Sequence, residues 1–133
     1  MEKNGLLNQE IDLHGAKILV VDDVSDNRML IDMYMRRTHS QILQATNGLE
    51  AIEMTEKNNP DLILMDIQMP IMDGYESVRR IRASGYKKPI IALTAHYMKE
   101  DCQMCVDAGC DDVLTKPARR KELLNKIQGI LTT

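Results

Sequence analysis

One carboxylate stands at the end of an apolar run, where a strand buried on both faces has no use for a charge. Residues 62–65 are Leu-Ile-Leu-Met, Asp66 follows them, and a loop containing Pro and Gly comes next. A second apolar run, residues 18–21, ends in two further acids, Asp22 and Asp23. Because ligands bind at the carboxyl ends of parallel strands in α/β proteins, these acids are the first candidates for chemistry.

Three carboxylates that share one crevice repel each other unless a positive charge lies between them. An oxygen-rich site of few carboxylates, completed by water, suits Mg²⁺, so the sequence predicts a magnesium site formed by Asp22, Asp23 and Asp66. Two alternatives stay open at this point. Asp22 or Asp23 caps the following helix instead. Asp66 is either a third metal ligand only, or a nucleophile that accepts a phosphoryl group as an acyl phosphate.

Two further polar side chains follow apolar runs. Thr94 comes after Ile90-Ile91-Ala92-Leu93, and Lys116 comes shortly after Val113-Leu114. A hydroxyl and an ammonium are the donors that a phosphorylated Asp66 needs. Taken singly, Thr94 is equally a cap of the next helix and Lys116 equally a solvated lysine. The case for chemistry rests on all of these residues reaching the same edge of one sheet.

The elements that must position them form five β–α repeats. We expect strands at residues 18–21, 41–46, 61–65, 90–93 and 113–114. We expect helices after Ser25 as N-cap, from Asn47 to Lys57, from Asp73, from Met98 to Ala108 and from about Arg119. This pattern predicts an α/β fold with a five-stranded parallel sheet, flavodoxin-like order 2-1-3-4-5 and helices on both faces. The crevice then lies between strands 1 and 3.

Length and composition fit a single domain. The chain has 133 residues, 44% of them apolar, and a net charge of −3, which does not favour attraction to nucleic acid or a membrane surface. No run approaches the ~20 apolar residues of a membrane span and no signal peptide is visible, so we expect a cytoplasmic protein. We expect residues 1–16 to be a tail or linker, with a short helical stretch around residues 6–13, and residues 17–133 to be the domain.

Over about residues 16–131 the chain resembles the receiver domain of two-component response regulators. The residues that carry the resemblance are Val20-Val21-Asp22-Asp23, Met65-Asp66-Ile67-Gln68-Met69-Pro70, Asp73-Gly74, Leu93-Thr94-Ala95, Ala108-Gly109-Cys110-Asp111-Asp112 and Lys116-Pro117. As an ordered set these motifs are highly specific.

The resemblance implies a role for each site residue. Asp66 is implied to be the phosphoacceptor. Asp23 and Asp66 are implied to bind Mg²⁺ directly with the backbone carbonyl of Gln68, and Asp22 through water. Thr94 is then the switch hydroxyl and Lys116 the cation that pairs with the phosphate, with the bond before Pro117 commonly cis.

The resemblance also implies how the site is tuned and read out. Gln68 and His96 occupy the positions that tune the lifetime of the acyl phosphate. The phosphoryl group would bias a face made by the fourth helix, fifth strand and last helix. Val113 stands where a switch aromatic usually lies, so the coupling must take another form, such as backbone movement.

The implied function is that of a phosphoacceptor in a phosphorelay, not a classical enzyme. The implied partner is a histidine kinase or histidine phosphotransfer protein, with no direct contact to nucleic acid or membrane. The motifs around Asp66 and Thr94 look most like receivers of hybrid sensor kinases, so the chain is either a stand-alone regulator or the C-terminal part of such a kinase. The alternative is a Mg²⁺-dependent phosphatase-like enzyme, which is disfavoured because residue 68 is Gln and not a second acid. A nucleotide or flavin binder is weaker still, since no glycine-rich phosphate loop is present.

Overall fold

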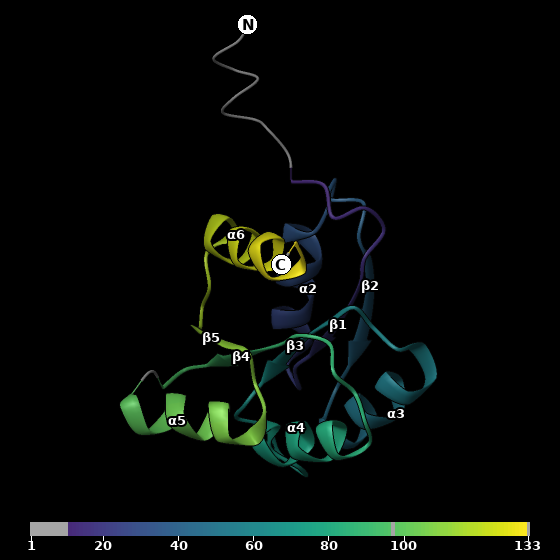
Figure 1. Ribbon diagram of the computed structural model, residues 1–133. Coiled ribbons are helices and arrows are strands. Elements are labelled where there is room, and N and C mark those ends of the chain that lie inside the picture. Colours follow the sequence, from purple (N-terminus) through teal and green to yellow (C-terminus); the bar gives the residue numbers. More distant parts are fainter. Residues whose placement is uncertain (1–10, 97, 133) are drawn as a thin grey trace, which may run out of the picture.

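The computed structural model describes residues 11–96 and 98–132. The strands are β1 (Lys17–Val21), β2 (Gln41–Ala45), β3 (Leu62–Asp66), β4 (Ile90–Thr94) and β5 (Asp112–Thr115). The helices are α2 (Ser25–Tyr34), α3 (Gly48–Asn58), α4 (Gly74–Ala83), α5 (Lys99–Ala108) and α6 (Arg120–Leu131). The strands form one parallel sheet in the order β2-β1-β3-β4-β5, which confirms the predicted fold (Figure 1).

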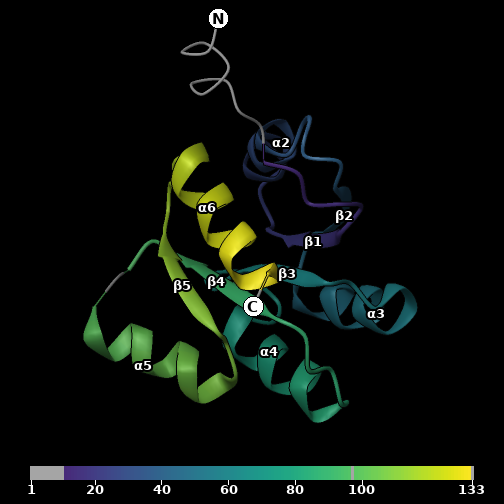
Figure 2. The same ribbon diagram turned by 45° about the horizontal axis from the view of Figure 1, so that its top comes forward.

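Two helical layers cover the sheet. Helices α2 and α6 lie on one face, and α3, α4 and α5 lie on the other, as both ribbon views show (Figures 1 and 2). Alternate residues of β3 serve the two layers: Ile63 and Met65 pack with the α3–α5 side, whereas Leu62 and Leu64 pack with the α2–α6 side. Because both faces are buried, the strand reads as a continuous apolar run in the sequence.

The predicted helix signals are mostly where the sequence placed them. The Asn47 side chain accepts a hydrogen bond from the Glu50 N–H at 2.8 Å, and the Asp73 side chain accepts one from the Glu76 N–H at 2.9 Å. These bonds satisfy N–H groups that the first turn of a helix leaves without a partner. Gly109 ends α5 with a φ of 121°, a conformation that glycine adopts readily.

The predicted N-cap of α2 was wrong by one residue. Val24 occupies that position and makes no side-chain cap, while Ser25 is the first helical residue. The reason lies upstream, because the Asp22 carboxylate accepts the Val24 N–H at 2.9 Å. The Asp22 carboxylate therefore accepts a backbone N–H at the entry to α2, where the Ser25 hydroxyl was expected to cap the helix.

The segment before β1 is joined to the domain where the structure describes it. Leu13 is buried in the α2–α6 layer of the core, and its N–H donates to the Thr38 carbonyl at 2.7 Å. The helical stretch expected around residues 6–13 lies mostly outside the described residues, and residues 11–13 are not helical. The boundary proposed at residue 16 remains a proposal.

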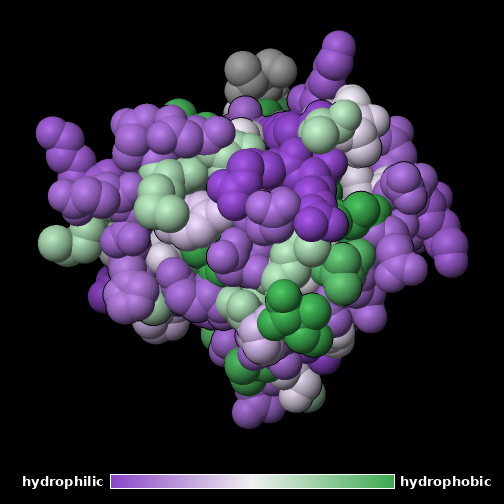
Figure 3. Space-filling model, turned by 90° about the horizontal axis from the view of Figure 1, so that it is seen from below, coloured by the Kyte–Doolittle hydropathy of each residue, from purple (hydrophilic) through white to green (hydrophobic). Residues whose placement is uncertain are grey.

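The face covered by α3, α4 and α5 is seen in Figure 3. Hydrophilic side chains cover most of it, and hydrophobic ones gather in smaller areas. Within residues 11–96 and 98–132, no helix has both the length and the apolar character that a membrane crossing requires.

Candidate functional site

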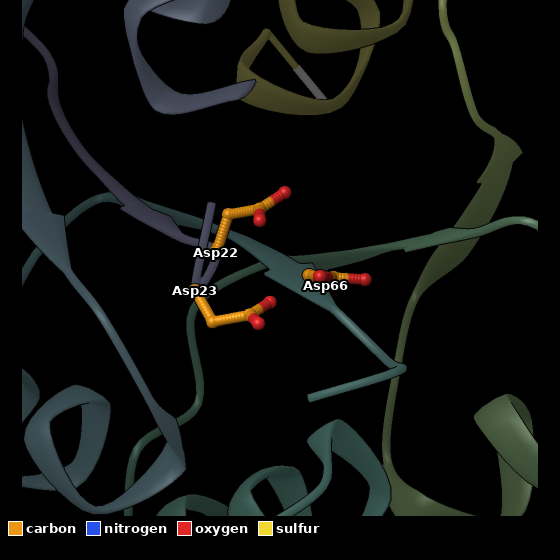
Figure 4. A group of neighbouring side chains, drawn as sticks. All are labelled: Asp22, Asp23 and Asp66. Atoms are coloured by element: carbon orange, nitrogen blue, oxygen red, sulfur yellow. The ribbon is translucent and has the colours of Figure 1, made fainter. Parts of the chain in front are cut away.

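The acidic residues meet between β1 and β3, where the order in which the strands are added to the sheet reverses. Strands β1 and β3 are neighbours in register, with Val21 opposite Met65, so the next residues on both strands emerge side by side. Figure 4 shows the side chains of Asp22, Asp23 and Asp66 at the ends of these strands, directed into the same space. Each offers a carboxylate oxygen, and these oxygens lie within 4.8 Å of one another. The predicted convergence of the three acids is therefore present.

Asp66 is buried, with 1% of its surface exposed. Burial raises the pKa of its carboxyl to about 6, and the negative charge of Asp22 adds to this rise. Lys116 and the Gln68 N–H, which donates to Asp66 at 3.3 Å, oppose the rise in pKa. At neutral pH Asp66 is thus ionised but held at an energetic cost, which a bound cation would relieve.

Lys116 is the cation that the fold supplies. Its Nζ lies 3.2 Å from Asp22 Oδ2 and 3.3 Å from Asp66 Oδ1. Burial lowers the pKa of this ammonium, but the charges of Asp66 and Asp22 outweigh burial and raise it overall. The Lys116 N–H donates to the Thr94 carbonyl at 2.8 Å, and the bond to Pro117 is cis, as the resemblance implied.

Asp22 has two functions in this arrangement. Its Oδ1 accepts the Val24 N–H at 2.9 Å and the Asn27 side-chain amide at 3.3 Å, while its Oδ2 faces Lys116. Asp22 is therefore not the cap of α2, whose N-cap is Val24, but it supports the entry into the helix while its other oxygen faces the site. Asp23 is exposed beside it, with its carboxylate open to solvent.

Thr94 is completely buried at the end of β4. Its Oγ1 lies 3.1 Å from the Gln68 side-chain nitrogen, 3.1 Å from the His96 N–H and 3.1 Å from the His96 carbonyl oxygen. The alternative that Thr94 caps the next helix is wrong, because the N-cap of α5 is Met98. Thr94 belongs to the crevice and to the loop that follows it.

The donor set fits Mg²⁺. Three carboxylates and one ammonium leave two uncompensated negative charges, which a divalent cation neutralises. In an octahedron with bonds of about 2.1 Å, neighbouring oxygens are roughly 3 Å apart and opposite ones roughly 4.2 Å apart. The spacing of the three carboxylates, within 4.8 Å, can close to these values with small side-chain movements.

Sequence reasoning missed two side chains around the crevice, and it named Gln68 as a tuning residue without its contact to Thr94. Asn27 binds Asp22, Arg28 donates to the Asp22 carbonyl at 2.7 Å, and the Gln68 amide reaches Thr94. Asn27 and Arg28 lie in the first turn of α2, shortly after Asp22 and Asp23. This spacing is the only feature of the sequence that places them near the crevice. The Gln68 contact joins loops 26 residues apart, so no local pattern could have revealed it.

Val113 occupies the half-buried position in β5 three residues before Lys116, and it packs against the core under α5. The side chain is too short and stiff to move between buried and exposed positions.

A groove of about 250 Å³ lies between α2 and α6 on the other side of Lys116. Its lining includes Leu30, Tyr34 and Pro117.

A parallel sheet of this order, with an acidic crevice at its switch point, defines a flavodoxin-like α/β protein. The chain belongs to the response regulator receiver domain family, whose model matches residues 18–128. It is 40% identical over 100 residues to the sensor histidine kinase RcsC of Escherichia coli K12, covering 75% of this chain and 10% of RcsC. It is 35% identical to the autoinducer 1 sensor kinase/phosphatase LuxN of Vibrio harveyi, covering 93% of this chain and 14% of LuxN.

A solved structure shows the same fold with a metal in place. The receiver domain of the sensor histidine kinase PA1611 from Pseudomonas aeruginosa superimposes with a TM-score of 0.83 at 36% identity, covering 90% of this chain and 99% of that one. That protein holds a magnesium ion coordinated in its active site cleft. The chain thus has the fold of receiver domains, including receivers of sensor kinases, and spans a small part of RcsC and LuxN.

Proposed function

We propose that Asp66 is the phosphoacceptor of this receiver domain in a phosphorelay. The observation that carries the proposal is the Asp66 carboxylate, buried beside Asp22, Asp23 and Lys116 at the switch point of the sheet. In the transfer, an Asp66 carboxylate oxygen forms a bond to phosphorus as the phosphorus–nitrogen bond of a phosphohistidine breaks. The electron pair stays on that imidazole nitrogen, and the other ring nitrogen of the donor carries a proton, so neutral histidine leaves.

We propose Mg²⁺ as the cofactor, held by the carboxylates of Asp23 and Asp66 and the Gln68 backbone carbonyl, with Asp22 acting through water. When bound, the ion supplies charge neutralisation between the carboxylates and the phosphoryl oxygens. The acidic cluster and the magnesium in the PA1611 receiver support this assignment.

The residues of the chain itself provide the other contacts. Lys116 already lies 3.3 Å from Asp66, so its ammonium is placed to pair with a phosphoryl oxygen on that carboxylate. Thr94 stands at the end of the adjacent strand, since Leu93 pairs with Asp66 across β3 and β4. Its hydroxyl is the second donor for the phosphoryl group. The chain acts on its own carboxylate, so we propose no turnover of external substrates.

We propose a histidine kinase or histidine phosphotransfer protein as the partner, and hence a cytoplasmic location. The exposed side of α2, next to the acidic crevice, carries apolar side chains that a helical partner can cover: Met29 is 59% exposed, Leu30 39% and Met33 50%. The groove between α2 and α6 continues this surface as far as Lys116. The likeness to RcsC and LuxN supports a receiver of the hybrid-kinase type.

The test is the mass of the protein after incubation with a small-molecule phosphodonor, with Mg²⁺ or with EDTA. We expect the wild type to gain one phosphoryl group only with Mg²⁺, and Asp66→Asn to gain none. Asp107→Asn, a change in an exposed acid of α5, is the matched control and should gain the group as the wild type does. Equal labelling of Asp66→Asn, or labelling of the wild type without Mg²⁺, contradicts the proposal.

A second measurement addresses the rate at which the phosphoryl group is lost. The His96 backbone is hydrogen-bonded to Thr94, so its exposed side chain stands at the rim of the crevice. We expect His96→Ala to open the approach of water and to speed autodephosphorylation about threefold, a change of under 1 kcal/mol in the barrier. His39 is an exposed histidine between α2 and the start of β2, at the end of the sheet away from the crevice. His39→Ala should therefore leave the half-life unchanged. An unaltered half-life in His96→Ala shows that His96 has no part in tuning.

A further inference from the structure

The side-chain amide of Gln68 joins the loop after β3 to the loop after β4. Its Oε1 accepts the Ala95 N–H at 3.2 Å, and its Nε2 donates to Thr94 Oγ1 at 3.1 Å. The two bonds agree on the orientation of the amide, because the oxygen must face the backbone donor. Gln68 is therefore a two-point bridge between loops that the sheet brings together from positions 27 residues apart.

The bridge belongs to an arrangement in which the Thr94 hydroxyl has no capacity left. Thr94 Oγ1 accepts from Gln68 and from the His96 N–H, and its single proton has two acceptors within the same arrangement, the His96 carbonyl at 3.1 Å and the Gln68 side-chain oxygen at 3.4 Å. The residue is completely buried, so solvent does not compete for the proton. Thr94 can donate to a new acceptor only after the contacts of this loop are broken.

A phosphoryl group on Asp66 presents such acceptors. Its oxygens accept hydrogen bonds strongly and donate none at neutral pH. Leu93 pairs with Asp66 in the sheet, so Thr94 and Ala95 are the next two positions on the neighbouring strand. The O–H of Thr94 and the N–H of Ala95 are the first donors after Leu93 on that side of the crevice, and the Ala95 N–H is occupied by the Gln68 amide.

We propose that Gln68 is a positioning residue that holds the loop between β4 and α5 in its resting arrangement, and that phosphorylation displaces its amide. This inference rests on the proposed function, since Asp66 must receive the group that competes with Gln68. The released loop leads directly to the start of α5. The signal thus reaches α5 through a change of backbone partners, which needs no rotating aromatic at Val113.

The bridge modestly favours the resting arrangement of the loop over the released arrangement. It consists of one exposed hydrogen bond, to Ala95, and one partly buried hydrogen bond, to Thr94, and water replaces mainly the exposed one when the amide is removed. We expect the loss of the bridge to raise the affinity for a phosphoryl mimic roughly fivefold, because less of the binding free energy is spent on breaking the resting arrangement.

Gln68→Met tests the bridge, since methionine has a similar length and no amide. The probe is beryllofluoride with Mg²⁺, titrated while the backbone amide resonance of Ala95 is followed by NMR. We expect the free variant to show Ala95 shifted towards its position in the complex of the wild type, and to bind the probe about fivefold more tightly. Gln128 lies on α6 near the residues that precede β1 and β3, at the end of the sheet away from the crevice. Gln128→Met should therefore change neither quantity.

An unshifted Ala95 resonance in Gln68→Met, together with an unchanged affinity, overturns the inference. The two proposals fail in different ways. If the wild type does not respond to beryllofluoride but Ala95 still shifts in Gln68→Met, the bridge exists and phosphorylation at Asp66 is the proposal that is wrong. If the wild type responds and Gln68→Met matches it in both measurements, only the bridge is wrong.

Discussion

Gly74→Ala is expected to destabilise the protein by about 3 kcal/mol, the upper part of the range for an overpacked site. A Cβ at this position would lie 2.5 Å from the Asp66 carbonyl oxygen and 2.7 Å from Ile67 Cα. Both neighbours are backbone atoms, so no side chain can rotate to make room. The Gly74 N–H also donates to the Ile67 carbonyl at 2.9 Å, which holds the start of α4 against the end of β3.

The same clash reaches the site, because the atom that must move belongs to Asp66 itself. We therefore expect Gly74→Ala to take up a phosphoryl group more slowly than the wild type even where it remains folded. Urea unfolding followed by circular dichroism measures the first effect, and the rate of mass gain from a small-molecule phosphodonor measures the second.

Gly129→Ala is the matched control for this prediction. Gly129 lies within α6, and a Cβ there would meet no atom within 4 Å other than those of its chain neighbours and the adjacent turns of the helix backbone. Alanine is favoured over glycine inside a helix, so we expect this variant to gain about 0.5–1 kcal/mol of stability. If Gly74→Ala unfolds at the same urea concentration as the wild type, the close approach of α4 to the end of β3 is not rigid.

The sheet could be predicted because its strands are buried on both faces. Residues 62–65 and 90–93 read as continuous apolar runs, and in the structure every residue of β3 and β4 is buried. The edge strand β2 reads as less apolar, and most of its residues are half-buried or exposed. Once the order of the strands is known, the polar residues at their ends must share one edge. That is why the positions of Asp22, Asp66 and Thr94 followed from the sequence.

Contacts between loops could not be predicted in the same way. The Gln68 amide reaches Thr94 and Ala95, and the Asp22 carboxylate accepts the Val24 N–H. Both depend on side-chain conformations set after the sheet has formed. Local propensity describes which residue types favour a cap or a loop, but it does not say which of several polar groups reaches a given donor.

The charge on Asp66 is expected to make the metal-free protein less stable as the pH rises. Burial and the neighbouring Asp22 raise the pKa of this carboxyl from 3.8 to about 6 in the folded protein. Below pH 3.8 the group is protonated in the folded and unfolded chains alike. Between these values the folded protein keeps a proton that the unfolded chain releases, so stability is lost as the pH rises to about 6.

Asp66→Asn removes this cost. A pKa rise from 3.8 to about 6 corresponds to roughly 3 kcal/mol at full strength, and we expect about 2 kcal/mol because solvent at the crevice screens part of it. In EDTA, the variant should therefore exceed the wild type in free energy of unfolding at pH 7.5, and the difference should shrink towards pH 4. Urea unfolding at several pH values measures it.

Asp61→Asn is a control of opposite sign. The Lys17 N–H donates to Asp61 at 2.8 Å and lowers the pKa of that carboxyl, with Lys88 contributing a further contact at 3.2 Å. Its stabilising effect is present above the ordinary pKa of 3.8 and is lost as the pH falls through the lowered value. Asp61→Asn should therefore be less stable than the wild type at pH 7.5. If Asp66→Asn also loses stability there, the pairing of Asp66 with Lys116 outweighs its burial, and the metal-free site is held together by its charges instead of strained by them.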